Sequence, residues 1–137
     1  MALDVGRARI GVALSDPGRS LAHPHGVIQR KNRDQVVREV GRLAAEHQVG
    51  LLVLGLPLAG EGRTGDAARA VLALGRRLER ALGLAVEYVD EFETTVEAEQ
   101  ALLAADVSRA RRRQVVDMLA ASLILRRYLE GQREEPR

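Results

Sequence analysis

Residues 2–15, which read ALDVGRARIGVALS, predict two short strands joined by a tight turn. The turn contains Gly6, and the apolar runs beside it, at 2–6 and 9–15, have the length of strands. A third extended piece is expected at 21–29, after a Pro-Gly turn. The chain therefore begins with a strand hairpin and one further strand.

A helix and a buried strand are expected next. The helix is indicated by apolar residues at helical spacing: Val36, Val37, Val40, Leu43 and Ala44. We expect Gly50 to end this helix. The apolar run at 51–54 lies between Gly50 and Gly55, which is typical of a strand covered on both faces. We expect this strand to be central in the sheet.

A loop rich in glycine and proline, at 56–65, leads into a second helix that Gly83 should end. The apolar stripe expected on this helix consists of Ala67, Ala70, Val71, Leu74, Leu78 and Ala81. A strand is expected at 84–89. It would complete a sheet of five strands.

Two helices should close the chain. Thr94 and Glu97 form a capping box at the start of a helix through Leu103, and a last helix should run from Ser108 to about Tyr128. This order predicts an α/β fold with a mixed sheet and right-handed crossovers. We expect one domain at residues 1–130, followed by a frayed polar tail at residues 131–137.

The composition limits the function. Cysteine is absent from the 137 residues, which excludes disulfides, thiolate zinc sites and cysteine nucleophiles and fits a cytoplasmic protein. We see no signal peptide and no apolar run long enough to span a membrane, so no membrane partner is expected. Aromatic residues make up only 2%, which argues against base stacking as the main route to nucleic-acid binding. Lys31 is the only lysine, and arginine binds phosphate through two nitrogens, although arginine richness can also reflect genomic composition.

Carboxylates in apolar surroundings are the main candidates for chemistry. Asp4 interrupts an apolar strand, and Asp117 shares a helix face with small and apolar residues, so each needs a cation or another partner. Asp90 and Glu91 follow a strand at the edge where sites of α/β folds gather, and spacing alone does not choose between them. If these groups converge, their oxygens suit Mg²⁺ or Mn²⁺. The alternatives are a turn cap for Asp4 and a salt bridge to an arginine for Asp117.

Glycines and arginines are secondary candidates. Gly6 and Gly11 would let backbone approach a phosphate, or they are needed only by the hairpin. Four arginines open the last helix, against the helix dipole, and indicate either phosphate contacts or a solvated face: Arg109, Arg111, Arg112 and Arg113. His23 and His25 have metal-ligand spacing but lack a third ligand nearby, so no zinc site is predicted.

Four motifs in order resemble the YqgF/RuvX family over nearly the whole chain. They are Ala2–Gly6 with Arg9–Ala13, Val53–Leu58, Asp90–Glu91 with Thr94–Ala98, and Val116–Ala121. The resemblance implies an RNase H-like (RuvC-like) fold and a nuclease linked to maturation of the 5′ end of pre-16S rRNA, with Holliday-junction cleavage as the alternative. It implies that Asp4, Glu91 and Asp117 are the catalytic, metal-holding carboxylates.

We expect a nucleic-acid partner, pre-rRNA first and branched DNA second; a homodimer is left open. The expected substrate-binding residues are Gly6, Arg9, Gly11, Gly55, Pro57, Arg111 and Arg113. The chain departs from the family at Phe92, where arginine is common, at Ala59, where asparagine is common, and ahead of Asp117, where arginines replace lysine. These departures bear on substrate positioning more than on metal binding. A non-catalytic ribosome-assembly factor that binds nucleic acid is therefore a second hypothesis. Nucleotide binding of the actin/sugar-kinase type is a third, but it needs two such domains.

Overall fold

The computed structural model describes residues 1–57, 65–90 and 108–134. The elements in chain order are β1 (Ala2–Val5), β2 (Arg9–Ser15), β3 (Ala22–Gln29), α1 (Arg33–Glu46), β4 (Leu51–Leu56), α2 (Asp66–Leu82), β5 (Ala85–Asp90) and α4 (Arg109–Glu134). The helix predicted after Thr94 lies outside the described residues.

The five strands form one mixed sheet in the order β3-β2-β1-β4-β5. The hairpin of β1 and β2 is antiparallel, as is the pair of β2 and β3, whereas β4 runs parallel to both β1 and β5. This confirms the predicted mixed sheet. As expected, β4 is an inner strand with parallel neighbours on both sides, while β1 holds the middle of the five strands.

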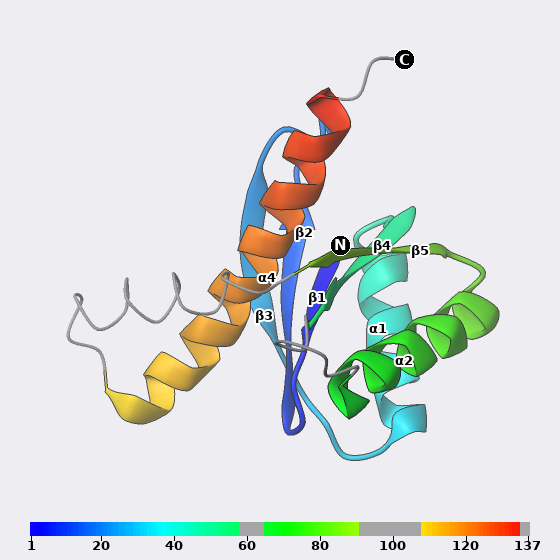
Figure 1. The fold of residues 1–137 in the computed structure, drawn as a ribbon, viewed down its shortest axis with the longest axis vertical. Helices are drawn as coiled ribbons and strands as arrows, with labels where there is room; N and C mark the ends of the chain where they lie inside the picture. Colours follow the sequence, from blue (N-terminus) through cyan, green and yellow to red (C-terminus); the bar gives the residue numbers. More distant parts are fainter. Residues whose placement is uncertain (58–64, 91–107, 135–137) are drawn as a thin grey trace.

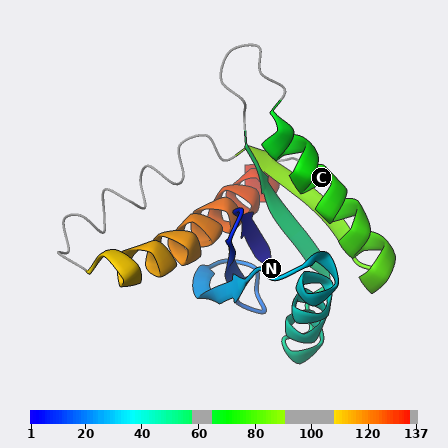
Figure 2. The same cartoon turned by 90° about the horizontal axis from the view of Figure 1, so that it is seen from below.

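The helices cover the two faces of the sheet in different ways (Figures 1 and 2). α1 and α2 lie on one face, over large apolar side chains such as Leu3, Val12 and Leu54. α4 crosses the other face, where the sheet presents small residues such as Ala2 and Ala13. Small side chains let a helix approach a sheet closely, so the α4 face is suited to bringing helix and strand residues together.

The ends of the helices differ in part from the predictions. α1 begins after Asn32, whose side chain accepts a hydrogen bond from Gln35 N at 2.8 Å, but it ends at Glu46 and not at Gly50. The chain turns there with Gln48 at a φ of 54°, and the remaining residues serve as a connection to β4. α4 continues to Glu134, beyond the predicted end near Tyr128.

α2 ends as predicted, with Gly83 in a left-handed conformation at a φ of 67°. Its buried stripe is narrower than expected, because three alanines predicted to belong to it are exposed: Ala67, Ala70 and Ala81. Val71, Leu74 and Leu78 pack on the sheet, and Gly75 lies beneath Tyr88. A single helix rests on a sheet along one line, so residues to either side of that line remain in solvent.

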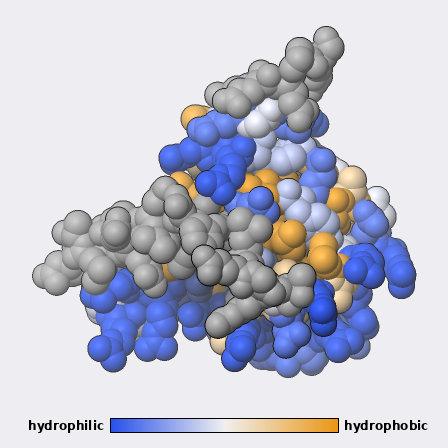
Figure 3. Space-filling view, in the orientation of Figure 1, coloured by the Kyte–Doolittle hydropathy of each residue, from blue (hydrophilic) through white to orange (hydrophobic). Residues whose placement is uncertain are grey.

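The surface is largely hydrophilic on the face shown in Figure 3, with hydrophobic residues gathered between α4 and α2. Leu21 is the exposed large hydrophobic residue of the described chain, at 58%. No helix in the described ranges is both long and apolar enough to cross a membrane.

Candidate active site

The site is built at one edge of the sheet. β1, β4 and β5 are parallel, so their carboxyl ends meet at the same edge. Asp4 lies one residue before the end of β1, Pro57 follows β4, and Glu91 follows β5 in the sequence. Glu91 lies outside the described residues, as do Phe92 and Ala59. Two of the three predicted carboxylates can therefore be placed.

Gly11 brings Asp117 onto the sheet. A Cβ atom built on Gly11 would lie 1.9 Å from the backbone oxygen of Asp117 and 3.1 Å from its Cα. No side chain fits in that space, so the glycine allows the backbone of α4 to touch the backbone of β2. Gly11 was predicted to approach a phosphate. The structure assigns this space to the helix.

Asp4 lies on the same side of the sheet as Asp117. Asp4 and Gly11 are directly opposite each other in the antiparallel pair of β1 and β2, so their side-chain directions share one face. That face is the one α4 covers, since Ala2 and Ala13 from the same strands pack with α4. Asp4 is half-buried. The sheet register and the helix contact thus place the residues Asp4 and Asp117 beside Gly11, on one face of the sheet.

Asp117 is paired with an arginine. Arg9 Nε donates a hydrogen bond to Asp117 Oδ2 at 2.7 Å, and the side chains are 28% and 19% exposed respectively. The sequence had left open a salt bridge to an unnamed arginine, and had placed Arg9 among the substrate-binding residues. The partners lie 108 positions apart, so no local pattern could have identified the pair.

Gly6 is needed by the hairpin turn. Its amide donates a hydrogen bond to Arg9 O at 2.9 Å, and a Cβ on Gly6 would lie 2.8 Å from that oxygen. Arg30, the residue after β3, donates a hydrogen bond from its guanidinium to Gly6 O at 2.7 Å. These contacts support the turn interpretation of Gly6. Its predicted contact with substrate stays a prediction.

Of the other predicted substrate residues, Gly55 is buried in β4, and Pro57 is half-buried just beyond that strand. Arg111 and Arg113 are exposed near the start of α4, which carries no acidic residue in its first turn. This part of α4 projects beyond the sheet (Figure 1). Arg111 and Arg113 are therefore open to a large anionic partner.

The donor chemistry fits a hard divalent cation. Asp4 and Asp117 offer carboxylate oxygens on one face, and Mg²⁺ or Mn²⁺ prefers such ligands. Within the described ranges no three metal-ligating side chains cluster, so the two aspartates need a further ligand. Elsewhere, the rings of His25 and His47 have centroids 4.8 Å apart, and they too lack a third metal-ligating side chain among the described residues.

Two contacts of α4 with β5 were not foreseen. Arg127 donates a hydrogen bond to the backbone oxygen of Asp90, the last residue of β5, and the Tyr128 hydroxyl donates to a Glu87 carboxylate oxygen. Both join residues about 40 positions apart. They tie the helix that carries Asp117 to the strand that ends just before Glu91.

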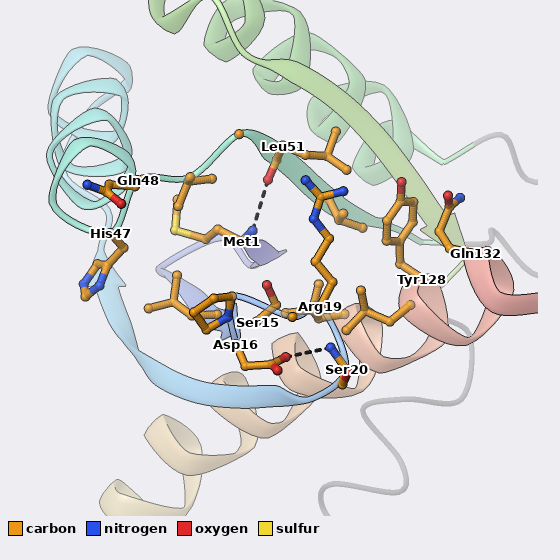
Figure 4. Close-up of a pocket in the computed structure, with 18 residues that line it drawn as sticks. Met1, Ser15, Asp16, Arg19, Ser20, His47, Gln48, Leu51, Tyr128 and Gln132 are labelled. Atoms are coloured by element: carbon orange, nitrogen blue, oxygen red, sulfur yellow. Dashed lines mark hydrogen bonds between the residues drawn. The ribbon is translucent and has the colours of Figure 1, made fainter.

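A cavity of about 1200 Å³ opens at the other end of the sheet (Figure 4). It lies at the amino ends of β1 and β4, where the Met1 amino group donates a hydrogen bond to Leu51 O at 3.0 Å. Burial lowers the pKa of this amino group to about 6. Asp16 in the same cavity accepts hydrogen bonds from the amides of Leu21 and Ser20, both at 2.7 Å, which lower its pKa. The Asp16 carboxylate is thus held by the backbone of its own loop, at the end of the sheet opposite Asp4.

A family model described as "RuvX: Holliday junction resolvase" matches residues 1–131. The chain belongs to this family. Among the RuvX relatives, a protein of Moorella thermoacetica is 45% identical over 130 residues, covering 95% of this chain and 93% of the relative. A Clostridium botulinum relative is 38% identical over 130 residues, covering 95% of each chain. Both are named "putative pre-16S rRNA nuclease".

The fold is similar to that of a solved RuvC. The structure titled "T. thermophilus RuvC in complex with Holliday junction substrate" superposes with a TM-score of 0.57 at 14% identity, covering 96% of this chain and 93% of that chain. The RNase H-like fold expected from the resemblance is therefore confirmed. At this identity the likeness concerns the fold alone.

Proposed function

We propose that this RuvX chain is a metal-dependent nuclease that hydrolyses phosphodiester bonds in the 5′ region of pre-16S rRNA. The observation that carries the proposal is the convergence of Asp4 and Asp117 beside Gly11, at the carboxyl edge of the parallel strands. The names of the relatives support the reaction and the substrate. We place the protein in the cytoplasm, where pre-rRNA of a bacterial cell is found.

The carboxylates would hold the ions, with Glu91 as the third ligand carried over from the family. Bound Mg²⁺ or Mn²⁺ would supply a Lewis acid for the phosphoryl group and an activated nucleophile. Asp117 contributes from a helix and Asp4 from a strand, and the contact at Gly11 fixes the two relative to each other. A site fixed in this way needs little rearrangement during the reaction.

The arginines would hold the substrate. Arg111 and Arg113 project from the exposed start of α4, close in sequence to Asp117, where they can bind phosphates that flank the cleaved bond. Their contribution should depend steeply on salt, because bound phosphates release counterions.

The test is cleavage of end-labelled pre-16S rRNA in Mg²⁺ or Mn²⁺ by the native protein and by Asp4→Asn and Asp117→Asn. Both substitutions should reduce cleavage at least about 100-fold, since each removes a ligand from the ions. Asp16→Asn is the matched control, because it changes a carboxylate in the cavity at the opposite end of the sheet. It should cleave as the native protein does.

Full activity of Asp117→Asn would remove this residue from the mechanism. A four-way DNA junction is the comparison substrate, and cleavage of the junction but not of the RNA would reassign the substrate. Salt-sensitive RNA binding with no product in either metal would favour a non-catalytic assembly role for the chain.

A further inference from the structure

We propose that Arg9 is an exchangeable counter-ion of the carboxylate site: it neutralises Asp117 when no divalent cation is bound and releases it when one binds. The proposal rests on the metal site proposed above. Arg9 was expected to bind substrate, whereas in this proposal its first partner is the carboxylate of Asp117. The proposal also predicts that the site binds metal less tightly than it would without Arg9.

The contact itself is strong and specific. Arg9 Nε and Asp117 Oδ2 are 2.7 Å apart, a charge-assisted hydrogen bond between two largely buried side chains. Asp117 lies on a helix face against the sheet, where a lone carboxylate charge would be costly. The guanidinium removes this cost in the metal-free protein.

A divalent ion at the same carboxylate cannot leave this arrangement unchanged. A cation bound to Asp117 would lie within a few ångströms of the guanidinium, and like charges at such a distance repel strongly away from bulk water. The ion must therefore compete with Arg9 for Asp117. The affinity for metal is then lower than two aspartates alone would provide.

The hairpin lets Arg9 leave without disturbing the site. Its backbone is fixed by the turn, where Arg9 O accepts a hydrogen bond from Gly6 N. The Arg9 side chain is long, and among the described residues it is held by the hydrogen bond from its Nε to Asp117. The planar fork of the terminal nitrogens suits a phosphate, so an Arg9 released by the ion can pair with the backbone of a nucleic acid. Metal and substrate would then favour each other's binding.

The test measures Mn²⁺ binding by electron paramagnetic resonance and thermal unfolding in EDTA, without any cleavage. Arg9→Gln should bind Mn²⁺ about tenfold more tightly than the native protein and unfold at a lower temperature in EDTA. Saturating Mn²⁺ should reduce this difference in unfolding temperature. Arg9→Lys keeps the charge and should bind Mn²⁺ within about twofold of the native protein.

Arg7→Gln is the matched control, since it removes an exposed arginine from the same hairpin two residues away. It should leave both the Mn²⁺ affinity and the unfolding temperature in EDTA unchanged. Equal or weaker Mn²⁺ binding by Arg9→Gln than by Arg7→Gln would overturn the exchange, provided that Asp117→Asn abolishes binding. If the native protein and Asp117→Asn bind Mn²⁺ equally or not at all, the proposed metal site fails and the exchange fails with it.

Discussion

Replacing Gly11 with alanine should damage the fold and the proposed site together. The new Cβ would lie 1.9 Å from the Asp117 backbone oxygen, whereas ordinary contact begins near 3.4 Å. Either α4 or β2 must then move by about 1.5 Å, and both clashing groups are backbone or rigidly attached to it. A flexible side chain cannot relieve this clash.

The expected cost is about 1–3 kcal/mol of unfolding free energy, the usual range for overpacking a core. For a domain of this size that lowers the urea midpoint by roughly 1 M. Cleavage should fall about 100-fold even where the protein is folded, since a shift of about 1 Å in a catalytic group has that effect. Circular dichroism in urea and the rRNA cleavage assay measure the two quantities.

Gly26→Ala is the matched control. Gly26 lies in β3 opposite Val12, and its added Cβ would meet no atom within 4 Å. Its free energy of unfolding should stay within about 1 kcal/mol of the native value. If Gly11→Ala unfolds at the same urea concentration as Gly26→Ala, the close approach of α4 to β2 is refuted.

Three further changes test contacts away from Gly11. Gly75→Ala should lower the unfolding temperature, because the new Cβ would overlap the Tyr88 hydroxyl. Adding Tyr88→Phe to Gly75→Ala should restore part of the lost unfolding temperature. If the effects of the two substitutions on stability simply add, this contact is contradicted. Asp16→Asn should lower the urea midpoint near neutral pH, because hydrogen bonds from the amides of Leu21 and Ser20 hold the pKa of Asp16 below the ordinary aspartate value of 3.8. A depressed carboxyl pKa stabilises the fold above 3.8 and ceases to do so as the pH falls through the folded-state pKa, so the two midpoints should converge in acid. Arg127→Met should raise amide hydrogen exchange near Asp90 without changing exchange in the β1–β2 hairpin; unchanged exchange near Asp90 would mean that the contact does not restrain the end of β5.

Much of the fold follows from local patterns in the sequence. The hairpin needed only two apolar runs around Gly6, and the run at 51–54 identified a strand covered on both faces. Asp117 was expected to face inward because it shares a helix side with Ala120 and Ile124, which are buried. Periodicity of this kind states which face of an element is covered.

Periodicity does not state which partner covers that face. The contact of Gly11 with Asp117 and the pairing of Asp117 with Arg9 both join segments more than 100 positions apart. Gly11 therefore looked like a turn or phosphate glycine, since a hairpin glycine and a packing glycine are identical in sequence. The early end of α1 has a local cause: Gln48 adopts a left-handed φ of 54°, and Val49 N donates a hydrogen bond back to Ala44 O at 2.8 Å, a closure that the apolar spacing does not signal.

The two faces of the sheet carry side chains of different size, and they serve different purposes. The face toward α1 and α2 carries bulky residues such as Leu3 and Ile10, which supply most of the large buried apolar surface. The face toward α4 carries Ala2, Gly11 and Ala13, whose small size contributes less burial but brings a helix backbone against a strand. A carboxylate pair needs that proximity more than it needs buried area, because its oxygens must reach one ion. Small residues on the α4 face are therefore expected wherever the two aspartates are to act together, while the opposite face can vary among apolar side chains of similar volume.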